Sequence, residues 1–366
     1  MNIVIIGAGV AGLSIGWRLQ QAGASVTVIE RAQAGRGATW ASAGMIAATA
    51  EMGESEGPAA QLSAYSAALW ADFPREIEDA SGVSIGFRRD GTMIVARSEV
   101  EAARLRDRTS DVLQFLPGNE ARKLEPLLAP NIHGALLDPT EAQVDNRALG
   151  SALAIAFRRA GGVLQINEAV VRLEIENGSA VAARTPFHLY GADAFVLAAG
   201  AWSARVEGLP PEAAPPIIPV KGEMIALQSG CETPPSHMIW GDDIYMLSRH
   251  GRLMVGATVA REGYDSATTD EAARWLYDRA VSLLPAAGQW DVVEHWAGLR
   301  PGSPDDLPLI GASALDGLFI ASGQFRNGIL FAPAIAETMR TILLDHTVPD
   351  SVRAFDPRRF TDGQVL

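Results

Sequence analysis

Three glycines near the start of the chain have the spacing that binds a diphosphate. Gly7, Gly9 and Gly12 follow the apolar residues 2–6, and a second apolar run ends on Glu30. The first glycine permits a tight turn, the second lets the backbone approach a pyrophosphate, and the third lets a helix pack against the strand. Glu30 is placed to accept a hydrogen bond from a ribose 2′-OH, and its charge disfavours a 2′-phosphate. The pattern therefore predicts a dinucleotide site that does not favour NADP.

A second residue with predicted chemistry is Arg300, in the apolar and glycine-rich segment WAGLRPG. A guanidinium in such surroundings is costly unless it has an anion as a partner. A carboxylate that accepts two parallel hydrogen bonds matches the planar guanidinium fork. The sequence leaves two partners open, a substrate carboxylate or an internal acid such as Asp305 or Asp306.

Apolar periodicity predicts the elements that position these residues. The first strand leads into a helix that begins at the glycine motif, and Asn177-Gly178 predicts a two-residue hairpin turn. A long helix is expected through residues 62–81, bent at Pro74, and residues 35–50 are expected to form a loop of small residues. Further helices are predicted at 98–116, 146–160, 269–284 and 332–344, and further strands within 84–96 and at 163–166, 195–200, 223–227, 244–248 and 252–257.

The order of these elements predicts an α/β fold with two interleaved domains. The 366 residues, 48% of them hydrophobic, suffice for two cores. One domain is expected to be Rossmann-like, with a parallel sheet and a β-meander, and the other to carry a mostly antiparallel sheet with helices. A proline-rich linker near residue 215 marks a boundary. The expected division is 1–50, 143–215 and 295–366 for the dinucleotide domain, and 51–142 and 216–294 for the substrate domain.

Charge and composition exclude several classes of function. A net charge of −13 opposes nucleic acid and anionic membrane surfaces. Cys231 is the only cysteine, so an intrachain disulfide is excluded, and the six histidines show no metal-ligand spacing. The apolar run of residues 3–17 is shorter than the ~18 residues that a membrane-spanning helix needs. We therefore expect a soluble cytoplasmic protein without a metal.

Several segments together identify a family resemblance that spans nearly the whole chain. The chain resembles the D-amino-acid oxidase superfamily of flavoproteins, and within it the thiamine-pathway glycine oxidases. The resemblance implies FAD, bound noncovalently because no cysteine lies near Arg300. The matching segments are the glycine motif, TWASAGM at 39–45, VLAAGAWS at 196–203, PVKGE at 219–223, IYMLSRHGRLMVGAT, HWAGLRPGSPDDLPLIG and GQFRNGILFAPA.

The resemblance assigns roles to individual residues. Arg300 and Tyr245 would hold the substrate carboxylate, with Arg326 and Met45 beside them as further active-site residues. Gly328 and Ile329 would precede a last helix whose N-terminus, with Pro333 near its start, faces the flavin. Trp40 replaces a serine of close relatives, so one cofactor hydrogen bond is expected to be missing or replaced. The implied FAD contacts are Gly7, Gly9, Val10, Ala11, Gly12, Glu30, Arg31, Thr39, Ser42, Ala43, Gly44, Met45, Val170, Ala199, Gly200, Trp202, Arg300, Arg326, Asn327, Gly328 and Ile329.

The implied activity is oxidation of a small amino acid that carries a carboxylate, with glycine favoured. Hydride would pass from the substrate Cα to flavin N5, and dioxygen would reoxidise the flavin to give hydrogen peroxide, with glyoxylate and ammonia as products. The imine could also serve thiazole formation in thiamine biosynthesis. Three alternatives stay open: an oxidase or dehydrogenase of D-amino acids or sarcosine with another acceptor, a tRNA-modifying oxidase, and a non-catalytic flavin-binding subunit. Relatives of this size lead us to expect a homo-oligomer, commonly a tetramer.

Overall fold

The first strand forms the centre of a six-stranded sheet. In the computed structural model, which describes residues 1–53, 55–229 and 233–360, the strand order is β18-β19-β12-β1-β2-β8. All neighbours pair in parallel except β18 and β19. The strands are β1 (Asn2–Ile6), β2 (Ser25–Ile29), β8 (Val163–Gln165), β12 (Ala194–Leu197), β18 (Leu309–Ala312) and β19 (Leu318–Ser322).

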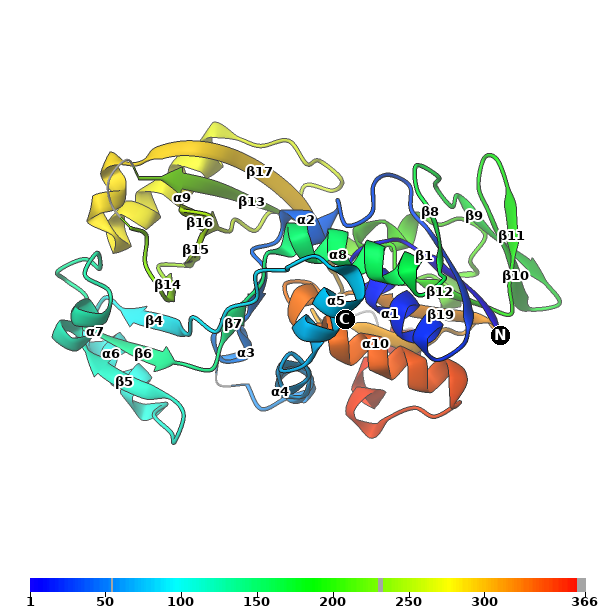
Figure 1. The fold of residues 1–366 in the computed structure, drawn as a ribbon, viewed down its shortest axis with the longest axis horizontal. Coiled ribbons are helices and arrows are strands. Elements are labelled where there is room, and N and C mark those ends of the chain that lie inside the picture. Colours follow the sequence, from blue (N-terminus) through cyan, green and yellow to red (C-terminus); the bar gives the residue numbers. More distant parts are fainter. Residues whose placement is uncertain (54, 230–232, 361–366) are drawn as a thin grey trace.

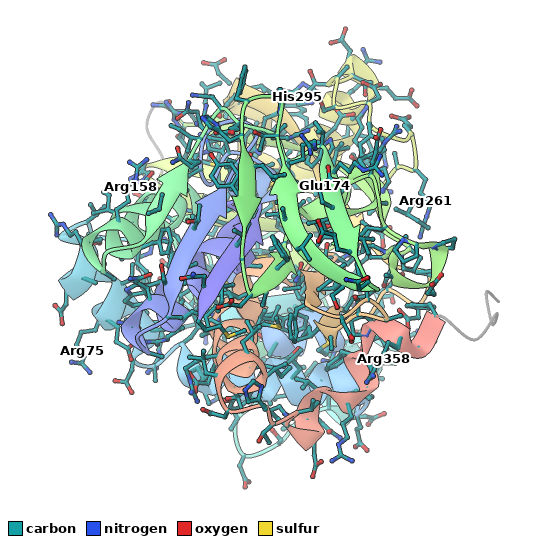
Figure 2. The ribbon with its side chains drawn as sticks, turned by 90° about the vertical axis from the view of Figure 1, so that its right-hand side faces the viewer. Arg75, Arg158, Glu174, Arg261, His295 and Arg358 are labelled. Atoms are coloured by element: carbon teal, nitrogen blue, oxygen red, sulfur yellow. The ribbon has the colours of Figure 1, made fainter. Side chains whose placement is uncertain are left out.

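Both faces of this sheet are covered, which explains why its strands are almost continuously apolar. Ile3 and Ile5 pack with the helices on one face. Val4 and Ile6 pack with the three-stranded sheet on the other face, which Figure 2 shows from outside with Glu174 labelled on it. The covering helices are α1 (Val10–Gln21), α8 (Asn146–Arg159) and α10 (Gly328–Leu344), and the covering strands are β9 (Arg172–Glu176), β10 (Ser179–Arg184) and β11 (Leu189–Gly191).

The second large sheet has eight strands and is mostly antiparallel, in the order β17-β13-β16-β15-β14-β4-β6-β5. Figure 1 shows the two sheets side by side, with β17 reaching toward α2. The strands are β4 (Thr92–Ala96), β5 (Gln114–Pro117), β6 (Gly134–Asp138), β13 (Ile218–Gln228), β14 (Met238–Gly241), β15 (Ile244–Arg249), β16 (Arg252–Gly256) and β17 (Asp291–Gly302), and the helices beside them are α6 (Glu99–Asp107), α7 (Gly118–Leu124) and α9 (Asp270–Leu283).

The predicted fold class, two interleaved units with one parallel and one antiparallel sheet, is confirmed. The hairpin turn is also confirmed, because Asn177 and Gly178 both have positive φ angles between β9 and β10. The antiparallel sheet crosses residue 295, since β17 pairs with β13 as far as Gly302. The domain boundaries themselves stay a prediction.

Three predicted segments are wrong in their extent. The helix expected at 62–81 is two helices, α4 (Pro58–Leu69) and α5 (Phe73–Ser81), because Pro74 lies in the first turn of a second helix instead of bending a single one. The helix expected at 98–116 ends at Asp107, and its apolar C-terminal part is strand β5. The last helix begins at Gly328, so Gly328 and Ile329 form its first turn and Pro333 lies inside it.

Ser66 of α4 and Trp70, the residue after this helix, bond the backbone of α10 close to Pro333. Proline removes a donor from the helix ladder. The Leu330 carbonyl accepts hydrogen bonds from Ser66 Oγ (2.5 Å) and from Trp70 Nε1 (2.9 Å). These two buried donors fix the start of α10 against α4.

The segment expected as a loop at 35–50 contains short elements instead. They are α2 (Ala38–Ala41), β3 (Met45–Ile46), which pairs with β7 (Ala142–Gln143), and α3 (Ala48–Met52). Contacts from other parts of the chain stabilise these elements, which is why local periodicity did not predict them.

The described ranges also contain five 3₁₀ helices. Their bounds are η1 (Gly200–Arg205), η2 (Pro211–Ala213), η3 (Pro285–Gln289), η4 (Asp350–Phe355) and η5 (Pro357–Phe360). No helix in the described part of the chain is both long and apolar enough to cross a membrane. Cys231 lies outside the described residues.

Two buried acids hold the start of α3. Glu141 Oε1 accepts the backbone N–H of Thr49 (2.6 Å) and of Ala50 (3.1 Å). Asp138 Oδ2 accepts the Thr49 hydroxyl at 2.7 Å. Burial raises the pKa of Glu141 to about 7, with a further contribution from the Asp138 charge.

This raised pKa predicts a pH-dependent stability. The folded protein binds the Glu141 proton more tightly than the unfolded chain, so this proton stabilises the fold. Its contribution to the unfolding free energy is fully present below about pH 4.5 and is lost as the pH rises through about 7. We expect Glu141→Gln to exceed the parent protein in unfolding free energy at about pH 8.5 by about 1 kcal/mol or more, with the difference shrinking toward about pH 5. Urea denaturation at both pH values measures this, with exposed Glu120→Gln as the control. The same pH dependence in Glu141→Gln as in the parent would contradict it.

Candidate active site

The predicted site residues gather around one cavity between the two large sheets. Its volume is about 840 Å³, and all of the predicted residues except Gly12 line it. Gly12 instead provides helix packing, because an added Cβ would lie 2.0 Å from the Gly7 carbonyl oxygen. Residues from distant parts of the sequence therefore meet here, as the fold of the two sheets requires.

The nucleotide-binding end of the cavity is built on the turn between β1 and α1. Gly7 has φ +107°, and a Cβ there would lie 2.5 Å from the Ala198 carbonyl oxygen. The Glu30 carboxylate accepts the backbone N–H of Ala8 (2.8 Å) and of Ala32 (3.1 Å). These bonds fix the Glu30 carboxylate at the cavity wall, at the end of β2 where the ribose contact was predicted.

Arg31 and Trp202 form a stacked pair at the same end. The Arg31 guanidinium carbon lies 3.4 Å from the centre of the Trp202 ring, and both residues line the cavity together with Val170. Partial burial lowers the pKa of Arg31 despite the neighbouring Glu30 charge. The pair forms a flat wall of the kind that stacks on a nucleotide base.

The predicted flavin loop is fixed by a half-buried arginine that the sequence did not single out. Arg249 donates to the Ala43 carbonyl (2.6 Å), the Val144 carbonyl (2.7 Å) and Asn146 Oδ1 (2.6 Å). Asn146 Nδ2 in turn donates to the carbonyls of Thr39 and Trp40, both at 2.8 Å. Burial lowers the pKa of Arg249 to about 10. The loop conformation is therefore set by a residue of the antiparallel sheet.

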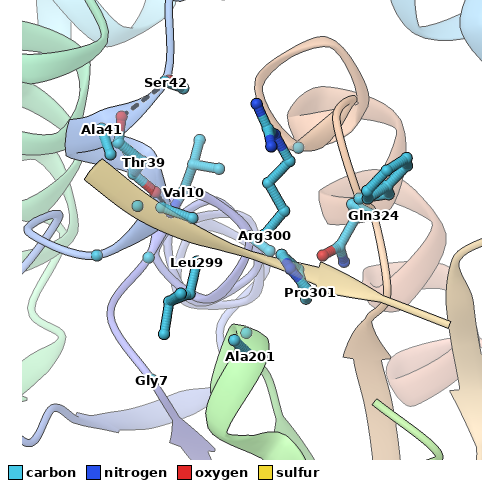
Figure 3. A pocket seen from close by; sticks show the side chains of 18 of the residues that line it. Gly7, Val10, Thr39, Ala41, Ser42, Ala201, Leu299, Arg300, Pro301 and Gln324 are labelled. Carbon is cyan, nitrogen blue, oxygen red and sulfur yellow. Dashed lines mark hydrogen bonds between the residues drawn. The ribbon is translucent and has the colours of Figure 1, made fainter. Parts of the chain in front are cut away.

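The Thr39 side chain links this loop to the glycine motif. Its Oγ1 accepts the backbone N–H of Val10 at 2.9 Å, within the first turn of α1. Ser42 Oγ donates to the Thr39 carbonyl at 2.9 Å (Figure 3). The threonine thus joins the two segments predicted to contact the dinucleotide.

Trp40, where close relatives were expected to carry serine, does not line the cavity. Its ring lies 3.9 Å from the Arg147 guanidinium carbon and 4.8 Å from that of Arg36, and meets the Trp296 ring edge-on. The substitution therefore replaces a side chain on the outer side of the loop. Thr39, Ala41 and Ser42 still line the cavity.

One face of β17 connects this loop with Arg300. Residues 296, 298 and 300 share that face, because side chains alternate along a strand. Trp296 Nε1 donates to the Ala41 carbonyl at 2.9 Å, and a Cβ on Gly298 would lie 2.4 Å from Ala41 Cβ. Figure 3 shows Arg300 and Leu299 leaving β17 on opposite sides.

The Arg300 guanidinium is held by backbone carbonyls and not by an acid. Nη1 donates to the carbonyls of Thr258 (3.0 Å) and Lys221 (3.3 Å), and the guanidinium also forms a hydrogen bond with the Tyr245 side chain. Asp305, which the sequence left open as its partner, is paired with Arg359 at 2.8 Å. Burial lowers the pKa of Arg300, and nearby Tyr245 opposes that effect. No acid of the described residues forms an ion pair with this guanidinium, so it and Tyr245 together can bind an anion in the cavity.

Glycines make room for both predicted carboxylate ligands. A Cβ on Gly222 would lie 2.3 Å from Nη1 and Nη2 of Arg300, so the guanidinium lies across this glycine. A Cβ on Gly256 would lie 2.7 Å from the Tyr245 ring and hydroxyl. Burial raises the pKa of Tyr245, so its hydroxyl stays a hydrogen-bond donor at neutral pH. Gly222, the glycine of the PVKGE segment, therefore provides the space that the Arg300 guanidinium occupies.

The N-terminus of α10 closes the same end of the cavity. Arg326, Asn327, Gly328 and Ile329 all line it. Unpaired N–H groups and the positive end of the helix dipole lie at such a terminus and favour negative charge. With the helix start at Gly328, the first turn of α10 itself lines the cavity.

The sequence did not indicate several further lining residues, among them Glu51, Met224, Trp240 and Gln324. Gln324 is 6% exposed, and its Nε2 has no hydrogen-bond partner among the described residues. In Figure 3 its amide is directed back toward β17. A buried amide donor without a partner is rare in a folded protein and fits a bound polar group. Glu51 and Gln324 carry no spacing signal; only their sequence proximity to Met45 and Arg326 could have indicated them.

These features fit an FAD molecule. The positive-φ Gly7, the N-terminus of α1 and Glu30 suit the adenosine diphosphate. The unpartnered Gln324 amide and the N-terminus of α10 suit the polar edge of an isoalloxazine. Among the described residues, no group of three or more His, Cys, Asp or Glu side chains is placed to hold a metal ion.

A dinucleotide cradle and an arginine without an internal acid partner, sharing one cavity, define a dinucleotide-dependent oxidoreductase. The sequence model of the family described as FAD dependent oxidoreductase matches residues 2–341. The chain belongs to this family of FAD-dependent oxidoreductases.

Individual relatives agree with this membership. The chain is 33% identical over 366 residues to a bifunctional protein ThiO/ThiG of Synechocystis, covering 98% of this chain and 54% of that protein. It is 31% identical to a glycine oxidase of Geobacillus kaustophilus, covering 98% and 96%. The crystal structure of glycine oxidase from Geobacillus kaustophilus superposes with a TM-score of 0.90 at 30% identity, covering 97% of each chain. The chain spans about half the length of the bifunctional relatives.

The contact between Gly222 and Arg300 predicts the effect of a single methyl group. We expect Gly222→Ala to displace the Arg300 guanidinium from the Thr258 and Lys221 carbonyls. Because a substrate carboxylate would then no longer be aligned, kcat/KM for an amino-acid substrate should fall about 10²-fold, mainly through a higher KM. Gly288→Ala is the matched control, since its nearest neighbouring atom lies 3.5 Å from the added Cβ. Steady-state kinetics of both variants measure the effect, and an unchanged KM in Gly222→Ala would contradict it.

Proposed function

We propose that the protein oxidises a small amino acid, most favourably glycine, to the imine, which hydrolyses to glyoxylate and ammonia. The observation that carries the proposal is the Arg300 guanidinium, which faces the cavity without an internal acid and with the Tyr245 ring beside it. The glycine oxidases among the similar proteins support it. When bound, FAD supplies a hydride acceptor at N5 and passes the electrons to dioxygen, with hydrogen peroxide as product.

The chain holds FAD along the whole cavity in this proposal. Gly7, Gly9 and the N-terminus of α1 bind the diphosphate, and Glu30 binds the ribose. The loop at 39–45, fixed by Arg249 and Asn146, runs along the cofactor with small side chains that let backbone N–H groups approach it. The N-terminus of α10 stabilises negative charge at the N1 and O2 edge of the ring system.

Arg300 and Tyr245 orient the substrate. The free edge of the guanidinium binds the carboxylate through two hydrogen bonds, and the Tyr245 hydroxyl donates a third. This grip turns the Cα–H bond toward the cofactor, so alignment supplies much of the catalysis. Arg326 and Met45 complete the wall around the substrate. The scheme asks no side chain to remove the Cα proton, because hydrogen leaves with its electron pair.

The finer assignments are part of the same proposal. We propose that the imine can pass to thiazole formation, in keeping with the similarity to one half of the bifunctional relatives. A homo-oligomeric assembly and a cytoplasmic location are also proposed. The tRNA-modifying and non-catalytic alternatives gain no specific observation from the cavity.

An anaerobic titration of the purified yellow protein tests the reaction and the substrate. We expect glycine to bleach the flavin absorbance, and sarcosine, D-alanine and D-proline to rank behind it. Mixing the reduced protein with air should restore the absorbance rapidly. Bleaching by D-proline or D-alanine but not by glycine would reassign the substrate, and slow reoxidation would indicate a dehydrogenase with another acceptor. Absence of bleaching by all four would contradict the proposed function.

Removal of Arg300 tests the carboxylate contact. We expect Arg300→Ala to weaken substrate binding by about 2–5 kcal/mol, because a buried charged hydrogen bond is lost. Glycolate, which keeps the carboxylate but lacks the amine, should lose a similar share of its affinity in a flavin spectral titration. Arg359→Ala is the control, since Arg359 pairs with Asp305 away from the cavity. Unchanged affinity in Arg300→Ala would move the contact to Arg326.

A further inference from the structure

Glu51 is held in place by contacts at both ends of its short helix. At the start of α3, Glu141 and Asp138 accept hydrogen bonds from Thr49 and Ala50, as described above. At the end, Arg108 Nη2 donates to the carbonyls of Gly53 (3.3 Å) and Thr49 (3.4 Å). Five residues do not form a stable helix alone. These contacts therefore fix the position from which Glu51 lines the cavity.

The Glu51 carboxylate shares the substrate end of the cavity with Arg300, Arg326 and Tyr245. No hydrogen bond or ion pair of this carboxylate is found in the described part of the chain. The surrounding protein raises the pKa of Glu51 through desolvation, and the Arg326 and Arg300 charges oppose that shift. An acid is costly in such surroundings without partners, so its charge has to be matched by the two arginines and by the ligand.

The charges in this compartment are complementary to one class of ligand. Arg300, Arg326 and Glu51 together carry a net charge of +1 when all three are ionised. One substrate carboxylate on Arg300 neutralises that charge, and the amine of the same substrate meets the opposite charge of Glu51. A second acidic group would meet Glu51 instead of a free cation, and like charges in a desolvated site repel strongly.

We propose that Glu51 is a specificity-determining residue that restricts the substrate to amines with a single carboxylate. This inference rests on the proposed function, because it takes the Arg300 site as the substrate site. The charge of Glu51 then balances that of Arg326. A second substrate carboxylate near Arg326 is repelled by the Glu51 carboxylate.

The experiment compares sarcosine with iminodiacetate, which adds one carboxylate to the same secondary amine. We expect Glu51→Gln to raise the ratio of kcat/KM for iminodiacetate to that for sarcosine by about tenfold or more. Glu51→Asp keeps the charge and should leave the ratio within about threefold of the parent value. Glu56→Gln is the matched control, because Glu56 is exposed on the same segment and does not line the cavity.

An unchanged ratio in Glu51→Gln would overturn the inference, and so would an equal rise in Glu56→Gln.

A second measurement needs no variant. Malonate, which is acetate with one more carboxylate, should perturb the flavin spectrum of the parent protein with at least about tenfold weaker affinity than acetate; equal affinities would also overturn the inference. Failure of the proposed function has a different signature, because neither sarcosine nor glycine would then reduce the parent protein.

Discussion

The site depends on a guanidinium that the fold encloses without giving it an acid. Arg300 stays in place because two backbone carbonyls, those of Thr258 and Lys221, accept from one nitrogen and because Gly222 leaves space beneath it. Carbonyls orient a cation without cancelling its charge. In the proposed function, a substrate carboxylate supplies the negative partner that the chain does not give Arg300, which offsets the cost of desolvating the guanidinium.

The two halves of the molecule are connected by side chains that bond the cavity-lining loop at 39–45. Arg249 from the antiparallel sheet holds the loop at 39–45 of the nucleotide-binding half, and Trp296 of β17 donates to Ala41 in that loop. A shift of β17 would therefore move both Arg300 and the loop predicted to contact FAD. In the proposed function, this coupling would keep the distance between the substrate carboxylate and the cofactor constant, as hydride transfer requires.

The sequence predicted the parts of this account that repeat a local physical pattern. The glycine spacing, the apolar strands and the Asn177-Gly178 turn follow from backbone conformation and burial, and the structure contains them all. Residues 98–116 were misassigned because the segment after Asp107 pairs with β6, and no local pattern shows that pairing. The start of α10 was placed too late because Pro333 resembles an N-terminal residue, whereas it lies inside the helix, close to the bonds from Ser66 and Trp70. The roles of Gly222, Arg249 and Glu51 could not be predicted, since each depends on contacts with residues far away in the chain.

A crystal structure of the yellow protein with bound glycolate tests the central claim most directly. We expect the glycolate carboxylate to lie within hydrogen-bond distance of Nη2 and Nε of Arg300 and of the Tyr245 hydroxyl, with its hydroxyl-bearing carbon over the flavin. Arg300 should keep its bonds to the Thr258 and Lys221 carbonyls. A glycolate bound to Arg326 alone, or an Arg300 ion-paired with an acid of the chain and turned away from the flavin, would contradict the account.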